Sequence, residues 1–119
     1  MIRVSIDAMG GDYAPREVVH GAVLAAREYG VSVQLVGRPQ DIENELKRHE
    51  IQGLNVSIVP ASEVVAMDEK PSKAVLRKKD SSIVKAMAQV AQGDADCVVA
   101  CGSTGAAAVA ATFIIGRLP

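Results

Sequence analysis

The stretch IRVSIDAMGGD, residues 2–12, decides the fold class. Its first six residues alternate apolar and polar side chains and are rich in β-branched types, which predicts a strand over residues 2–7. Two glycines then form a loop, and Pro15 stands where a helix can begin without losing a hydrogen bond. A strand that passes through a glycine loop into a helix opens a βαβ unit, so we expect a parallel sheet.

The same alternation continues along the chain. Apolar periodicity predicts further strands at residues 32–36, 55–59 and 96–100, and helices that begin at Pro15 and Pro39 or span residues 72–79, 81–92 and 106–115. The pattern therefore predicts one α/β domain over residues 1–119, with helices on both faces of a mainly parallel sheet.

Two apolar segments carry further expectations. The strand at residues 96–100 is short and apolar, which predicts burial on both faces, and Cys97 and Cys101 are expected to be buried thiols. The helix at residues 106–115 is apolar nearly all round and needs more protein packed on it. We therefore expect the chain to be the N-terminal portion of a longer protein, and its domain to be incomplete.

Composition excludes several classes of protein. Hydrophobic residues make up 49% and charged residues 23% of the 119 residues, which is typical of a globular domain and not of a disordered chain. A net charge of −1 and an aromatic content of 3% argue against nucleic-acid binding. Arg3 and Asp7 interrupt the first apolar stretch, so we expect no secretion signal and a cytoplasmic location.

The first glycine loop, residues 7–12, follows the first predicted strand, at the strand end where parallel sheets bind ligands. It contains Asp7, Gly10, Gly11 and Asp12. Adjacent glycines let backbone N–H groups approach an anion, so the loop is a candidate anion site. A tight turn from strand to helix, with Asp12 near the helix start, explains the same residues.

The second glycine loop, Gly102-Ser103-Thr104-Gly105, lies between the last predicted strand and the apolar helix. Free N–H groups, hydroxyls and the positive end of the helix dipole would meet there, which favours binding of an anion. A helix cap made by Ser103 or Thr104 is the alternative. The spacing matches neither the P-loop nor the dinucleotide-binding motif, so we expect no nucleotide cofactor.

The basic segment, residues 70–85, is the third candidate. Its Lys and Arg residues surround the single acid Asp80, so the segment carries +5 in a chain of net charge −1. Such a concentration of positive charge attracts an anionic ligand or an acidic protein. A charged face that is simply exposed to solvent would have the same composition. Lys73 and Arg77 would share one helix face, and the residues after Asp80 open the next helix, where a phosphate would find N–H donors.

Three motifs in this order resemble the PlsX family of phosphate acyltransferases of bacterial phospholipid synthesis. They are DAMGGDxAP at residues 7–15, KPxxAVxRKKDSS at residues 70–82 and GxTGA at residues 102–106. The chain departs from the family pattern at Ser103, where Asn is expected. The resemblance spans this whole chain and only the leading part of a family member.

The resemblance implies a three-layer α/β/α fold like that of isocitrate dehydrogenase and phosphotransacetylase, in a homodimer. It implies transfer of a fatty acyl group from acyl-[acyl carrier protein] to inorganic phosphate, with no cofactor or metal. A membrane glycerol-3-phosphate acyltransferase would use the acyl phosphate, which puts the protein in the cytoplasm or at the inner face of the membrane. Two alternatives stay open: a phosphate acetyl- or butyryltransferase that uses an acyl-CoA, and a non-catalytic module that docks an acidic carrier protein.

The residue types suit this chemistry. Phosphate is the nucleophile, so the protein must hold an anion in line with the thioester carbon and stabilise the developing oxyanion. Glycine loops and lysines suit the first task, and backbone N–H groups at residues 102–105 suit the second. The predicted catalytic residues are Lys73, Arg77 and Asp80. The predicted phosphate- and substrate-binding residues are Asp7, Gly10, Gly11, Asp12, Lys78, Lys79, Ser81, Ser82, Gly102, Ser103, Thr104 and Gly105.

Overall fold

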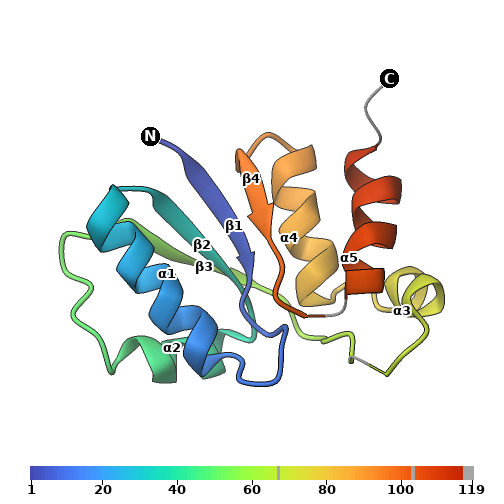
Figure 1. The fold of residues 1–119 in the computed structure, drawn as a ribbon, viewed down its shortest axis with the longest axis horizontal. Helices are drawn as coiled ribbons and strands as arrows, with labels where there is room; N and C mark the ends of the chain where they lie inside the picture. The colour runs from blue at the N-terminus through green and yellow to red at the C-terminus, as the bar shows by residue number, and fades with distance from the viewer. Residues whose placement is uncertain (67, 103, 117–119) are drawn as a thin grey trace.

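The computed structural model describes residues 1–66, 68–102 and 104–116. Its strands are β1 (Arg3–Asp7), β2 (Ser32–Gly37), β3 (Val56–Pro60) and β4 (Cys97–Val99). They form a parallel sheet in the order β3-β2-β1-β4 (Figure 1). The helices are α1 (Arg16–Tyr29), α2 (Pro39–Leu46), α3 (Pro71–Arg77), α4 (Ser82–Ala91) and α5 (Thr104–Ala110), which continues as the π-helical turn η1 (Ala111–Ile115).

The central strand β2 contributes side chains to two hydrophobic cores, because successive residues of a strand point to opposite faces of the sheet. Val33 and Leu35 join the core with α1 and α2, whereas Val36 packs with Ala86 of α4. Helices therefore cover both faces of the sheet. The predicted α/β class, with three layers and a parallel sheet, is confirmed.

Local signals in the sequence set the helix ends. Gly30 ends α1 with φ +67°, and its N–H donates to the Ala26 carbonyl at 3.1 Å. Glycine adopts this left-handed conformation without a Cβ penalty. The Ser81 hydroxyl caps α4 by accepting from the Val84 N–H at 3.4 Å. Pro15 occupies the N-cap position before α1 rather than the first helical position; neither position needs an N–H that bonds within the helix.

Strand β4 departs from the prediction. It lies at the edge of the sheet and pairs with β1, and Cys97 and Val99 are exposed. Burial on both faces is therefore wrong, and so is the expectation of buried thiols, because Cys97 and Cys101 are both exposed. The reason is that α1 packs over β1 and β2 and leaves an apolar groove of about 400 Å³ beside Val99.

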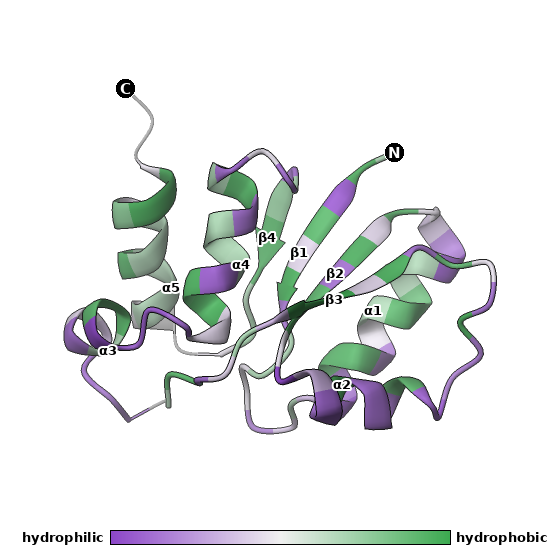
Figure 2. Ribbon diagram, turned by 180° about the vertical axis from the view of Figure 1, so that it is seen from behind, coloured by the Kyte–Doolittle hydropathy of each residue, from purple (hydrophilic) through white to green (hydrophobic). Residues whose placement is uncertain are grey.

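Helix α5 and its continuation η1 are predominantly apolar (Figure 2). Ala106 and Ala110 are buried in a core shared with α3 and α4, whereas Phe113 is 71% exposed. The helix predicted at residues 106–115 is confirmed, and it begins earlier, at Thr104. Among the helices of the described ranges, none combines the length and the apolar character needed to cross a membrane.

Replacing Leu35 by Ala should lower the free energy of unfolding by about 2–5 kcal/mol, because this side chain is fully buried on the central strand and its loss leaves a cavity. The matched control is Leu76→Ala on α3, where the side chain is 62% exposed and the change should stay within about 0.5 kcal/mol. Urea unfolding followed by circular dichroism measures both variants. Equal losses in the two would contradict the assigned core.

Candidate anion site at the carboxyl edge of the sheet

The two glycine loops meet at the carboxyl edge of the sheet. They follow neighbouring parallel strands, since β1 pairs with β4 through Ile6 and Val99. A Cβ on Gly102 would lie 2.9 Å from the Gly10 Cα, and a Cβ on Gly10 would lie 2.9 Å from the Gly102 nitrogen. Gly11 beside them has φ +101°. Glycine is required here because two backbones touch and one of them takes a left-handed turn.

Asp7 ends β1, and the residue is only 5% exposed. Its Oδ1 accepts from the Met9 N–H at 3.1 Å, which fixes the first glycine loop in its turn. Burial raises the pKa of Asp7, while the nearby Ser82 hydroxyl and the N–H groups of Met9 and Gly10 act in the opposite direction. A buried carboxylate bonded to its own loop shapes that loop, and its negative charge repels a phosphate.

Ser82 brings the basic segment to the same place. It is the first residue of α4, and it is buried beside the Asp7 carboxyl. Its hydroxyl makes no hydrogen bond of normal geometry within the described residues. A Cβ on Gly105 would lie 2.5 Å from Pro71 Cγ, so the start of α5 packs against the start of α3. The three predicted segments, far apart in the sequence, therefore meet.

The cations of the basic segment differ in their surroundings. Lys73, Arg77 and Lys79 are exposed, and no ion pair is seen for them in the described part of the chain. Lys73 and Arg77 lie four apart on α3, so they share a face as predicted. The Lys78 ammonium instead donates to a main-chain carbonyl at 2.9 Å and to Glu69, whose pKa this bond lowers. Lys78 therefore anchors the loop before α3.

Asp80 is engaged on both carboxylate oxygens. The Ser62 N–H, at 2.9 Å, and the Ser62 hydroxyl donate to Oδ2, while the Lys85 ammonium lies 3.4 Å from Oδ1. These bonds lower the pKa of Asp80, the Ser62 hydroxyl most of all. An ionised Asp80 orients Lys85 and has no proton to give a leaving group at neutral pH. Sequence reasoning missed Ser62, which no local motif marks and which the bridge between Glu63 and Ser81 brings to Asp80.

The cluster of loops leaves little space within it. A cavity lined in part by Asp7, Ile83 and Gly102 measures about 10 Å³, which is room for roughly one water molecule. A phosphate ion would therefore not fit between the loops. Ser103 and the side chain of Thr104 lie outside the described residues, and with them the contacts and caps predicted for the two. No cluster of metal-ligating side chains occurs within residues 1–66, 68–102 and 104–116.

A parallel sheet whose carboxyl edge carries two touching glycine loops and an exposed cationic helix places the chain among the open α/β proteins, which bind their ligands beyond the carboxyl ends of the strands. Within that class, the chain belongs to the family described as "Fatty acid synthesis protein", which matches residues 2–119. The resemblance found in the three motifs is confirmed.

Curated relatives of the chain are named phosphate acyltransferases. Over 117 residues the chain is 53% identical to that of Pelotomaculum thermopropionicum and 50% identical to that of Geobacter sulfurreducens. Each alignment covers 98% of this chain and 34% of the relative. A relative from Clostridium botulinum is 45% identical over 116 residues, which are 97% of this chain and 35% of that protein. The chain thus spans about a third of the length of the curated relatives it matches.

Gly10→Ala should lower the free energy of unfolding by about 1–3 kcal/mol, because the new Cβ meets the backbone of Gly102 and one loop must move. Gly21→Ala is the matched control. Gly21 lies within α1, and a Cβ added there would meet no other atom within 4 Å, so alanine should raise stability by up to about 1 kcal/mol. Thermal unfolding compares the two. A stable Gly10→Ala variant would refute the close approach of the loops.

The Asp7→Asn substitution should remove a loss of stability that the wild type shows as the pH rises. Because burial raises the pKa of Asp7, the folded state binds the proton more tightly than the unfolded chain. The wild type therefore loses stability as the pH rises from the unfolded pKa, about 4, through the folded value. Asn has no charge to bury, so the free energy of unfolding of the variant minus that of the wild type should grow across this window. Urea titrations at a series of pH values measure the difference, which a constant or falling trend would contradict.

Proposed function

We propose that the chain forms part of a phosphate acyltransferase that moves a fatty acyl group from a thioester donor to inorganic phosphate. The convergence of both glycine loops and the basic segment at one edge of a parallel sheet carries this proposal, because ligands of such sheets bind at that edge. The names of the relatives supply the reaction class.

The reaction requires few groups from the protein. An oxygen of phosphate attacks the thioester carbonyl carbon, a C–O bond forms, the C–S bond breaks, and the thiolate leaves and takes up a proton. Because phosphate is already a nucleophile, catalysis consists of holding two reactants in line and stabilising the oxyanion. In this proposal Lys73 and Arg77 draw phosphate to the loops, and backbone N–H groups of the second glycine loop face the oxyanion. Asp80 acts by orienting Lys85, not as an acid.

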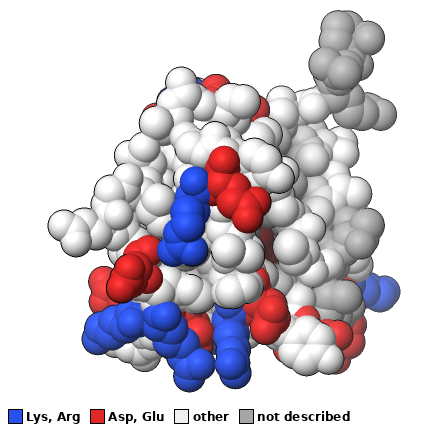
Figure 3. Space-filling view, turned by 60° about the vertical axis from the view of Figure 1, so that its left-hand side comes forward, with Lys and Arg blue, Asp and Glu red and all other residues white. Residues whose placement is uncertain are grey.

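An acyl-[acyl carrier protein] is the proposed donor. Lys73, Arg77 and Lys79 are exposed together on and after α3, where an acidic carrier protein could dock. The face over α1 and α2 instead carries Lys and Arg among Asp and Glu, so it offers no field of one sign (Figure 3). Formation of a homodimer, a cytoplasmic or inner-membrane location and delivery of the acyl phosphate to a membrane glycerol-3-phosphate acyltransferase belong to the same proposal.

The double variant Lys73→Ala, Arg77→Ala tests the proposal. Acyl-phosphate formation from an acyl carrier protein thioester and phosphate should fall by about 100-fold or more, since each lost charge-assisted contact weakens binding by roughly 10-fold or more. Lys47→Ala is the control, because Lys47 is an exposed cation at the far end of α2. Assays should use the full protein and vary phosphate and carrier separately, which divides the loss between the two ligands. Unchanged turnover in the double variant would remove both residues from the site.

The two alternatives give different results in the same assay. A higher rate with an acyl-CoA than with the carrier thioester would indicate a phosphate acetyl- or butyryltransferase type of enzyme. Binding of the carrier protein without any acyl phosphate would indicate a docking module.

A further inference from the structure

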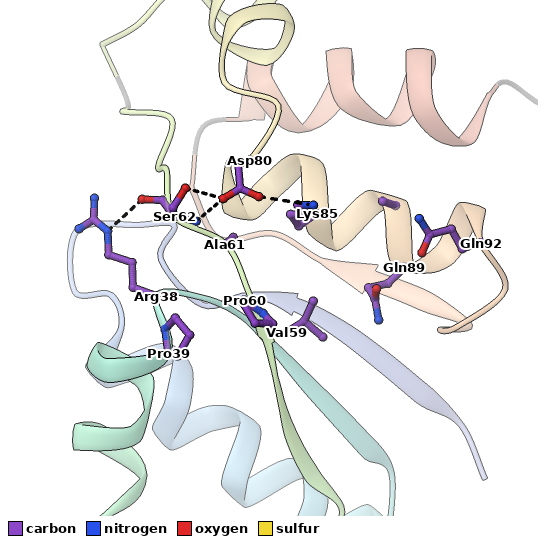
Figure 4. Close-up of a pocket in the computed structure, with 11 residues that line it drawn as sticks. Arg38, Pro39, Val59, Pro60, Ala61, Ser62, Asp80, Lys85, Gln89 and Gln92 are labelled. Carbon is purple, nitrogen blue, oxygen red and sulfur yellow. Dashed lines mark hydrogen bonds and ion pairs between the residues drawn. The ribbon is translucent and has the colours of Figure 1, made fainter.

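A hollow of about 710 Å³ opens beside α4, at the end of β3 and the start of α2, within the size range of small-molecule sites (Figure 4). Its walls come from the end of β3, from the residues that follow β2 and β3, and from Asp80 and half-buried side chains of α4. No residue of either glycine loop lines it. Of the segments that the sequence singled out, the basic segment contributes Asp80 and Lys85 to the hollow.

Four polar side chains stand in a row along one side of the hollow: Arg38, Ser62, Asp80 and Lys85 (Figure 4). The Arg38 Nε donates to the Ser62 carbonyl at 3.3 Å, and Ser62 in turn donates to Asp80 through its N–H and its hydroxyl. The Lys85 ammonium completes the row, 3.4 Å from Asp80. These hydrogen bonds and the ion pair hold Arg38 and Lys85 at the two ends of the row without a ligand.

The row has more donors than acceptors. Both oxygens of Asp80 are already engaged by Ser62 and Lys85, which offsets the negative charge of the carboxylate. The Arg38 guanidinium keeps its terminal N–H groups and the Lys85 ammonium keeps further protons, with no other acceptor seen for them in the described residues. Two cations around one carboxylate leave a net charge of +1, which favours an anion, and the several oxygens of a phosphate can accept hydrogen bonds from both cations at once.

The rest of the hollow is largely apolar. Val59, Pro60, Ala61 and Ala88 form this part of the lining. Gln89 at its margin is held by a hydrogen bond from its Nε2 to the Gln34 side chain at 3.1 Å. An inorganic ion would leave this apolar surface exposed to water, whereas an aliphatic group attached to the anion would bury it.

We propose that this hollow binds a phosphate monoester or acyl phosphate with an aliphatic chain, its phosphate on Arg38 and Lys85 and its chain on Val59 and Ala88. The site follows from the geometry alone. That its natural occupant is the acyl phosphate made by the enzyme rests on the proposed function. A site for this ligand beside the glycine loops would keep the acyl phosphate bound to the protein after the acyl group has been transferred.

Calorimetric titration of the full protein with octyl phosphate, a stable alkyl phosphate, tests the site. Arg38→Gln and Lys85→Gln should each weaken binding by about 10-fold or more, the loss expected for one charge-assisted contact. Lys47→Gln, which removes an exposed cation at the opposite end of α2, should bind as the wild type does. Ala88→Leu fills the apolar part and should weaken binding of octyl phosphate while leaving inorganic phosphate unaffected.

Several outcomes would overturn the proposal. They are wild-type affinity in the Arg38→Gln and Lys85→Gln variants, equal affinity for inorganic and octyl phosphate, or octanoate binding as tightly as octyl phosphate. Arg38 and Lys85 are at least partly exposed, so both variants should fold, and circular dichroism checks this. The titration contains no thioester. Binding that depends on Arg38 in a protein that forms no acyl phosphate would support the hollow and refute the proposed function.

Discussion

The contact between the backbones of Gly10 and Gly102 is the constraint on which the functional edge of the molecule depends. A side chain at either position would lie 2.9 Å from the other loop's backbone. Because the loops touch, the ends of β1 and β4 form one surface. The Asp7 carboxylate fixes the first glycine loop by accepting a hydrogen bond from the Met9 N–H. Ser82 places the start of α4 beside the same carboxyl. Removing the contact would separate the three segments that meet at this edge.

The two carboxylates described at this edge are bonded within the protein, whereas the cations of α3 are exposed. The Asp7 carboxylate is buried beneath the loops, where burial raises its pKa. The Asp80 carboxylate is bonded to Ser62 and Lys85, which lower its pKa. Each acid therefore has a structural partner, whereas Lys73 and Arg77 stay exposed to an anion arriving from solvent. The same arrangement puts Lys85 and Arg38 at the rim of the neighbouring hollow.

Local patterns predicted most of the elements correctly. The alternating residues of β1, the left-handed Gly30 after α1 and the hydroxyl cap of Ser81 depend on neighbours in the chain, so they can be recognised without a structure. The prediction was wrong for β4. Its apolar composition is typical of a buried strand, yet Cys97 and Val99 are exposed, because burial depends on what lies over a strand and not on the strand itself.

The amino-acid sequence by itself determined the parallel α/β class, the family and the three segments that carry the candidate site, since periodicity, glycines and charge runs are local. Only the tertiary structure decided which side chains bond to one another or lie side by side. It showed that Lys78 is tied to Glu69, that Asp80 is bonded to Ser62, and that Arg38 and Lys85 flank one hollow. Arg38 and Lys85 come from different βα units, whereas the other two pairings join parts of the long connection between β3 and α4. The distance between Arg38 and Lys85 is set by the packing of helices on the sheet, which no spacing along the chain records.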